Sequence, residues 1–209
     1  MLNYLLTNWM DTLGVILGLL YLWLEIKEKA LMWLVGCIMP IIYIFVLYKA
    51  GIYGDCGLEV YYFLAGLYGL YFWLKKNKAG RKEEDTLNEK QQKEENGQTI
   101  KRTPIRLALQ LAIIALFLWG ALGIFLQECT DSKVPWIDAL TNSLSIIGMW
   151  MLSRKYLEQW WVWFVVDALS TALYIYKGIY GRAFLYTIYT LIALYGYWKW
   201  RKSMTAQEN

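Results

Sequence analysis

Gly178-Ile179-Tyr180-Gly181 repeats a tetrapeptide that stands 127 residues earlier in the chain, as Gly51-Ile52-Tyr53-Gly54. Shifting the chain against itself by the same interval aligns four pairs of tryptophans: Trp9 with Trp136, Trp23 with Trp150, Trp33 with Trp160, and Trp73 with Trp200. A shared tetrapeptide and shared rare residues make chance similarity between apolar segments a poor explanation. The alignment therefore indicates two copies of one unit, the first near the start of the chain and the second near its end.

Apolar segments of nearly constant length surround the repeated residues. Each is close to the ~20 residues that cross a ~30 Å hydrocarbon core as a helix. The seven segments run approximately over 9–26, 30–49, 56–75, 105–127, 136–153, 158–176 and 180–200. The pattern predicts an all-α integral membrane protein with seven transmembrane helices.

The composition supports a membrane environment. Of the 209 residues, 58% are hydrophobic, and the chain holds 12 Trp and 17 Tyr, more than a soluble fold of this length could bury. These side chains suit membrane interfaces and aromatic-lined pockets. The net charge of +4 is small, and basic residues gather at the ends of apolar segments, so the expected partner is a lipid bilayer and not a nucleic acid.

Several kinds of chemistry are excluded by composition. The chain has no histidine, which removes His-based acid–base catalysis, Ser-His-Asp triads and His metal sites. Its three cysteines, Cys37, Cys56 and Cys129, lack the spacing of a zinc site and do not form a disulfide framework. We therefore expect no metal, no cofactor and no catalytic residue.

The repeat predicts how the chain is organised. Residues 1–76 form a first three-helix repeat, residues 77–103 a charged, disordered cytoplasmic loop, residues 104–128 a linker helix and residues 133–203 a second three-helix repeat. The linker helix adds one crossing, so the second repeat enters the membrane in the orientation of the first. The result is a 3+1+3 parallel repeat with pseudo-twofold symmetry along the membrane normal. Transporters built from repeats bind their solute between them, near the midplane.

The distribution of Lys and Arg predicts the orientation. Basic residues cluster after the third segment, before the fourth, after the fifth and after the seventh, as at Lys75, Arg102, Arg154 and Lys199. Cytoplasmic ends of spans carry this excess of positive charge. The prediction is an N-terminus outside and a C-terminus in the cytoplasm.

Two carboxylates within the predicted spans are the strongest candidates for solute binding. Asp167 lies in the middle of the sixth segment, and Glu59 lies a few residues into the third. Ionisable groups in spans are costly and usually functional. Both break the repeat, since Asp167 aligns with Pro40 and Glu59 with Tyr186. Polar groups that differ between the halves favour an asymmetric ligand over shared scaffolding.

Aromatic and polar side chains at helical spacing extend this candidate site. Trp160, Trp163 and Asp167 share one helix face and predict an aromatic slot with a negative floor, which suits a flat, positively charged heteroaromatic ring. The fifth segment carries a polar stripe, and the seventh offers tyrosine hydroxyls. The additional candidates are Asn142, Ser145, Tyr186 and Tyr189. Packing within the helix bundle is the alternative interpretation of each.

The motifs Val134-Pro135-Trp136-Ile137-Asp138, Trp160-x-x-Trp163-x-x-x-Asp167 and Tyr176-Lys177-Gly178-Ile179-Tyr180 resemble those of the PnuC family of vitamin transporters. The resemblance covers all seven segments. It implies a SWEET-like architecture in a bacterial cytoplasmic membrane and uptake by facilitated diffusion, with cytosolic phosphorylation trapping the solute. It also implies that Trp160, Trp163 and Asp167 line the substrate site, and that the substrate is nicotinamide riboside or, in a related branch, thiamine.

Other hypotheses stay open at this point. An acid at Glu59 suits the aminopyrimidine of thiamine and weakens the nicotinamide riboside assignment, which still ranks first. An intramembrane enzyme could use Asp167 and Glu59 as a carboxylate pair, and a membrane sensor would bind solute without transport. A homo-oligomer is compatible with the sequence.

Overall fold

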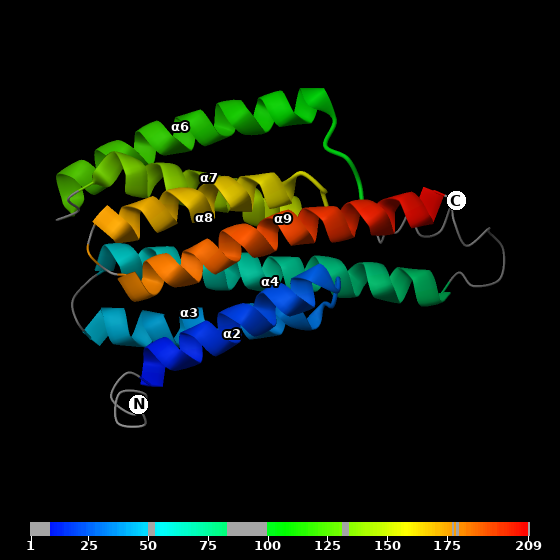
Figure 1. Ribbon diagram of the computed structural model, residues 1–209, viewed down its shortest axis with the longest axis horizontal. Coiled ribbons are helices and arrows are strands. Elements are labelled where there is room, and N and C mark those ends of the chain that lie inside the picture. The colour runs from blue at the N-terminus through cyan, green and yellow to red at the C-terminus, as the bar shows by residue number, and fades with distance from the viewer. Residues whose placement is uncertain are drawn as a thin grey trace. The chain divides into compact units, whose positions relative to one another are not determined.

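The computed structural model describes residues 9–49, 53–82, 100–130, 134–176, 178 and 180–208, and these residues form seven helices (Figure 1). They are α2 (Trp9–Ile26), α3 (Leu31–Lys49), α4 (Tyr53–Lys82), α6 (Ile105–Cys129), α7 (Pro135–Ser153), α8 (Gln159–Tyr176) and α9 (Tyr180–Glu208). All seven predicted segments are therefore helical, which confirms the all-α prediction. The only bridge between described extended segments joins Lys101 and Tyr156.

Two helices are longer than their apolar segments. α4 continues to Lys82 and α9 to Glu208, beyond the predicted ends at 75 and 200. Charged residues such as Lys are good helix formers, so the backbone stays helical after the apolar sequence ends. The structure therefore differs from the predicted disordered loop 77–103 at both of its ends. Residues 77–82 are helical, and Ile100 is buried, with 4% of its surface exposed. The rest of that prediction, residues 83–99, lies outside the described residues.

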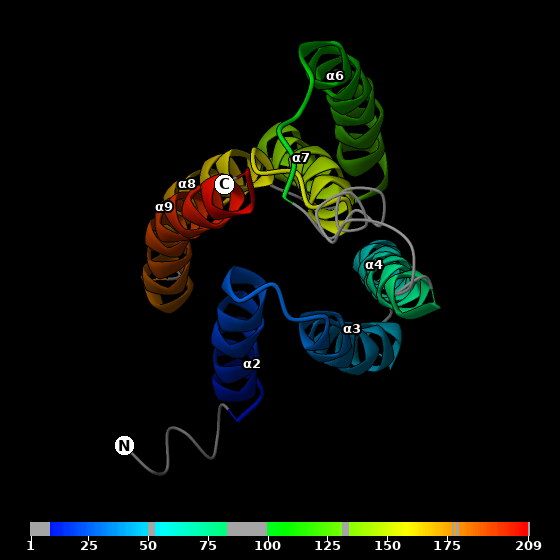
Figure 2. The ribbon, with the colours of Figure 1, turned by 90° about the vertical axis from the view of Figure 1, so that its right-hand side faces the viewer.

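The chain divides into two compact units, unit 1 (Met1–Lys75) and unit 2 (Lys76–Asn209). Unit 1 holds α2, α3 and most of α4. In unit 2, α7 lies between α6 and α8, and α8 lies beside α9 (Figure 2). Shifted by 127 residues, α2, α3 and α4 coincide with α7, α8 and α9 to within one residue at every end.

The turns within the two units have the same geometry. Glu28 ends the α2 turn with φ 53°, and Lys155 occupies the equivalent place after α7 with φ 57°. Each sits in a Schellman motif, which satisfies the last carbonyls of a helix. The hydrogen bonds of this motif are Glu28 N to Glu25 O and Lys29 N to Leu24 O, both 2.9 Å, and Lys155 N to Leu152 O and Tyr156 N to Met151 O, both 3.0 Å.

The repeated tetrapeptide leads into the last helix of each unit. Gly178 has φ +73°, a left-handed conformation that favours glycine, and Tyr180 then begins α9. Tyr53 begins α4 at the corresponding position, whereas Gly51 lies outside the described residues. The tetrapeptide therefore marks the start of a helix in both units, and in unit 2 its first glycine forms the preceding turn.

A tryptophan packed on a glycine joins the second and third helices of each unit. A Cβ atom added to Gly69 of α4 would lie 2.4 Å from the Trp33 indole, and one added to Gly196 of α9 would lie 2.5 Å from the Trp160 indole. The edge of the ring contacts a second tryptophan in both units, with ring centroids 6.0 Å apart for Trp33–Trp73 and 5.6 Å apart for Trp160–Trp200. The duplication thus includes the packing core of each unit.

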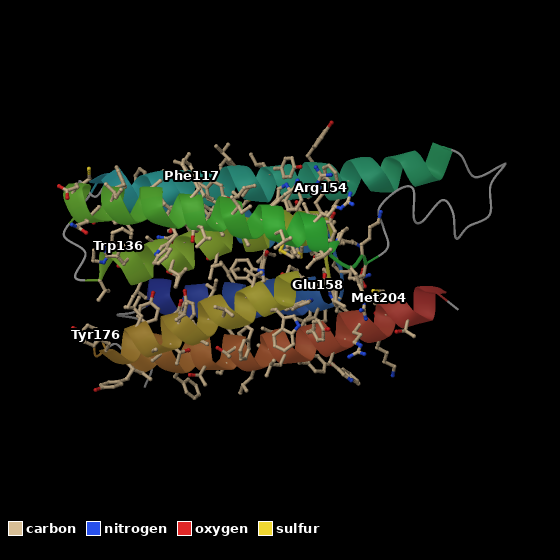
Figure 3. The ribbon with its side chains drawn as sticks, turned by 90° about the horizontal axis from the view of Figure 1, so that it is seen from above. Phe117, Trp136, Arg154, Glu158, Tyr176 and Met204 are labelled. Atoms are coloured by element: carbon tan, nitrogen blue, oxygen red, sulfur yellow. The ribbon has the colours of Figure 1, made fainter. Side chains whose placement is uncertain are left out.

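α6 packs on α7 and exposes an apolar face. Trp136 fits against Gly123, and the Trp119 indole N–H donates to the Trp136 carbonyl at 2.9 Å. Phe117, labelled in Figure 3, is 75% exposed and Ile113 is 67% exposed. Among the described helices, α6 alone is long and apolar enough to cross a membrane by its length and composition; α2 and α3 contain shorter apolar runs, Val15–Ile26 and Leu31–Ile42. An uncovered apolar face of this kind suits contact with lipid.

The polypeptide that leads into α6 is bound to the α7–α8 turn. Thr103 donates to Glu158 Oε2 from both its backbone N–H and its hydroxyl, each at 2.7 Å, and Lys101 N donates to Lys155 O at 3.0 Å. Figure 3 shows Glu158 and Arg154 toward one end of unit 2, and Trp136 and Tyr176 toward the other. The start of α6 is therefore fixed at the Arg154 end of the unit.

Removing the Glu158 carboxylate should destabilise this junction. Glu158→Ala leaves two donors of Thr103 without their acceptor, and we expect a loss of about 1–2 kcal/mol in the free energy of unfolding. Thermal unfolding in detergent measures the loss. Thr205→Val is the control, because the Thr205 hydroxyl donates only to the Arg201 carbonyl of its own helix at 3.1 Å. Equal unfolding temperatures for the two variants would contradict the structural role of Glu158.

Candidate substrate site

Asp167 is a buried carboxylate in the middle of α8, with 7% of its surface exposed. The nearby Thr171 hydroxyl donates to the backbone carbonyl of Asp167, at 2.9 Å, and not to its carboxylate. Within the described part of unit 2, no group donates a hydrogen bond to that carboxylate. A charge in this position is costly unless something pairs with it. The structure therefore leaves Asp167 able to bind a cationic or hydrogen-bond-donating solute.

Trp163 lies one helical turn before Asp167 and packs against α7. A Cβ atom added to Gly148 would lie 3.2 Å from Cε2 of the Trp163 indole. The indole Nε1 is buried and meets no acceptor among the described residues. Residues at this spacing lie on the same face of a helix. Trp163 thus brings an aromatic ring with an unpartnered indole N–H to the helix face that carries Asp167.

Trp160 is placed differently from Trp163. It is 1% exposed, and its ring is enclosed by Trp200 and Gly196 of α9. The same contact exists in unit 1 around Trp33, so Trp160 belongs to the packing that the two units share. The structure does not bring the Trp160 and Trp163 rings together as two walls of one slot. Trp163 is the tryptophan that we retain in the candidate site.

Tyrosines of α9 lie against the same side of α8. Tyr186 contacts Tyr174 of α8, with ring centroids 5.1 Å apart, and Tyr189, at 5.6 Å. Tyr189 is also close enough to Asp167 to interact with its charge. Three aromatic rings therefore line the α8–α9 interface on the side of Asp167, and the substrate-binding roles of Tyr186 and Tyr189 stay predictions.

The polar candidates on α7 differ in their availability. Asn142 is half-buried and makes no hydrogen bond to a described residue. Ser145 is buried, and its hydroxyl donates to the Thr141 carbonyl one turn earlier at 2.8 Å. Its oxygen can still accept a hydrogen bond, whereas Asn142 offers both donor and acceptor. Asn142 is the better solute-binding candidate.

Glu59 belongs to α4 in unit 1. It is half-buried on α4. The other candidate residues all belong to unit 2. Its predicted role in the site therefore rests on the sequence argument alone.

Sequence reasoning missed two fully buried polar residues at equivalent ends of the units. Glu25 is 1% exposed at the end of α2, and Gln159 is 0% exposed at the start of α8. Both stand beside charged turn residues, such as Lys27 and Glu158, and hydropathy does not distinguish them from these neighbours. The signal that could have found Glu25 is its spacing of four from Tyr21, the same spacing that joins Trp163 to Asp167.

Comparison with known proteins places the chain in a family. A family model described as nicotinamide mononucleotide transporter matches residues 8–202. The chain belongs to this transporter family. The PnuC proteins are among its relatives, which confirms the resemblance seen in the sequence, and the protein is a membrane transporter and not an enzyme.

Individual relatives cover nearly the whole chain. The nicotinamide riboside transporter PnuC of Escherichia coli K12 is 26% identical over 94% of this chain and 86% of its own length. The riboflavin/roseoflavin transporter RibM of Streptomyces davaonensis is 25% identical over 92% of this chain and 84% of its own length. A crystal structure of the vitamin B3 transporter PnuC has a TM-score of 0.71 at 22% identity, covering 98% of this chain and 86% of that chain. This likeness confirms the fold of the transporter family.

Proposed function

We propose that the protein takes up nicotinamide riboside across a bacterial cytoplasmic membrane by facilitated diffusion. The observation that carries the proposal is the buried Asp167 carboxylate, which has no donor among the described residues and lies one turn from Trp163. The pyridinium of nicotinamide riboside is a flat cation that pairs with the carboxylate and stacks on the indole. Each aromatic contact with such a ring contributes about 1–2 kcal/mol.

The remaining polar groups suit the rest of this solute. Its carboxamide and ribose hydroxyls need donors and acceptors, and Asn142, Ser145, Tyr186 and Tyr189 offer them from α7 and α9. Trp163 Nε1 is a further donor. Glu59, half-buried on α4 of unit 1, is the remaining residue of the predicted set.

The charge of the solute decides between related substrates. RibM and the E. coli PnuC are almost equally similar to this chain, so identity does not separate a flavin from a riboside. Riboflavin is uncharged and does not neutralise Asp167. Nicotinamide mononucleotide carries a phosphate that the carboxylate repels. Thiamine is a cation with a thiazolium ring and is the main alternative.

The expected direction is from outside to cytoplasm, with the N-terminus outside and the C-terminus inside. Lys199, Arg201 and Lys202 near the end of α9 support this orientation, because positive charge is retained on the cytoplasmic side. Facilitated diffusion needs no coupling ion, and phosphorylation of the riboside by a cytosolic kinase would prevent its return.

Uptake into proteoliposomes tests the proposal. We expect labelled nicotinamide riboside to enter without an imposed ion gradient, and unlabelled riboside to compete at least about 10-fold better than riboflavin or nicotinamide mononucleotide, a difference of ~1.4 kcal/mol. Thiamine competing better than the riboside would move the assignment to the alternative. Uptake that requires a proton or sodium gradient would contradict facilitated diffusion, and binding without uptake would indicate a sensor.

A further inference from the structure

The contact that seats Trp163 is a reversed copy of a contact in unit 1. Tyr21 of α2 corresponds to Gly148 of α7, and Gly36 of α3 corresponds to Trp163 of α8. In unit 1 the large ring comes from the first helix: a Cβ atom added to Gly36 would lie 2.9 Å from Tyr21 Cε2. In unit 2 it comes from the second helix, and the glycine is on the first. The same helix–helix contact is therefore built with the large and small residues exchanged.

A neighbouring contact is not exchanged. One turn before Trp163, the Trp160–Gly196 contact keeps the orientation of Trp33–Gly69, with the tryptophan on the second helix and the glycine on the third in both units. The turns that join the helices also match, with left-handed residues at equivalent positions. The backbone framework is thus conserved between the units while one aromatic side chain changes helix.

Because the aromatic ring is on α8 and not on α7, it lies on the same helix as the Asp167 carboxylate. On α8, Trp163 precedes Asp167 by four residues and shares its face. A ring on α7 would instead stand four residues before Leu152, an apolar side chain that is 0% exposed. The aromatic ring can lie beside the unit 2 carboxylate only if α7 leaves room for it, and Gly148 supplies that room.

We propose that Gly148 is a positioning residue for the substrate: its missing side chain seats the Trp163 indole where it stacks on a solute paired with Asp167. This inference rests on the proposed function. A methyl group at position 148 would lie 3.2 Å from Cε2 and 3.4 Å from Cζ2 of the indole, with Val162 Cγ1 also at 3.4 Å. Because Val162 limits movement of the methyl, the indole shifts by a few tenths of an ångström. Binding geometries lose affinity over displacements of about 0.5 Å.

The test uses the full-length protein in detergent, labelled with fluorotryptophan, and measures both fluorine NMR spectra and the Kd for nicotinamide riboside. Trp163→Phe identifies the Trp163 resonance. Gly148→Ala is expected to shift that resonance and to raise the Kd about 3- to 10-fold. The matched control, Gly36→Ala, places the same methyl against Tyr21 in unit 1 and is expected to leave both the resonance and the Kd unchanged.

An unchanged resonance or an unchanged Kd in Gly148→Ala overturns the positioning role, as does an equal rise in Kd for Gly36→Ala. If the wild-type protein fails to bind the riboside while Gly148→Ala still shifts the resonance, the proposed substrate is wrong and the seating of Trp163 stands.

A double variant separates positioning from packing. Gly148→Tyr combined with Trp163→Gly gives unit 2 the arrangement of unit 1 and refills the space from α7. The unfolding temperature of this double variant is expected to stay close to that of the wild type, whereas riboside binding is lost. Wild-type affinity in this variant would show that an aromatic ring on either helix serves, which would overturn the proposal.

Discussion

Asp167→Asn is expected to weaken the binding of nicotinamide riboside about 100-fold, a loss of ~3 kcal/mol, because it removes one partner of a buried charge pair. The substitution keeps the shape of the side chain, so folding should be preserved. Isothermal titration of the purified protein measures the Kd, and thermal unfolding checks that the variant is intact.

An uncharged ligand sharpens the test. Dihydronicotinamide riboside has nearly the same shape as the riboside but lacks the positive charge. The wild-type protein should prefer the cation, and Asp167→Asn should bind the two ligands with similar affinity. Asp138→Asn is the control, since Asp138 is half-exposed in the first turn of α7 and should leave binding intact. If Asp167→Asn weakens the binding of both ligands equally, the role of the carboxylate is not charge pairing.

Most of the fold could be predicted from the sequence, because its determinants are local or repeated. Apolar segments of about 20 residues mark helices through length alone. The 127-residue repeat marks equivalent helices without knowledge of their packing. Helix ends were less predictable: hydropathy records where apolar residues stop, whereas α4 and α9 continue through charged residues that are good helix formers.

The candidate site could be predicted only in part, because a helix face is wider than a single contact. Trp160 and Trp163 are three residues apart and point about 60° from each other around the α8 axis. That angle is small enough to predict one common face, yet it turns Trp160 to α9 and Trp163 to α7. What separates them is the position of two glycines, Gly196 and Gly148, on neighbouring helices. No periodicity within α8 contains that information.

The repeat itself held the missing clue about Trp160. Residues that differ between the halves were predicted to bind solute, and this criterion selects Asp167, aligned with Pro40. Trp160 aligns with an identical residue, Trp33, and by the same criterion belongs to the scaffold. The structure agrees with the criterion at Trp160: each ring is buried on a glycine of the third helix, at Gly69 or Gly196.

Substituting Gly69 or Gly196 is expected to give the largest losses of stability. In Gly69→Ala and Gly196→Ala the new methyl would lie 2.4 Å and 2.5 Å from an indole that is at most 1% exposed. Atoms cannot approach so closely, and a buried ring has no room to retreat, so the helices must separate. We expect each variant to lose about 1–3 kcal/mol in the free energy of unfolding, with Val at either position preventing folding.

The sign of this effect distinguishes packing from helix propensity. Alanine favours a helix over glycine by about 1 kcal/mol, so an uncrowded glycine should gain stability when it is replaced. Gly120 in α6 is the matched control, because a Cβ atom there meets nothing within 4 Å. The unfolding temperature should therefore rise or stay level in Gly120→Ala and fall in both Gly69→Ala and Gly196→Ala. If the unfolding temperature fell in only one of Gly69→Ala and Gly196→Ala, the repeated tryptophan contact would stabilise the two units unequally, despite its conserved geometry.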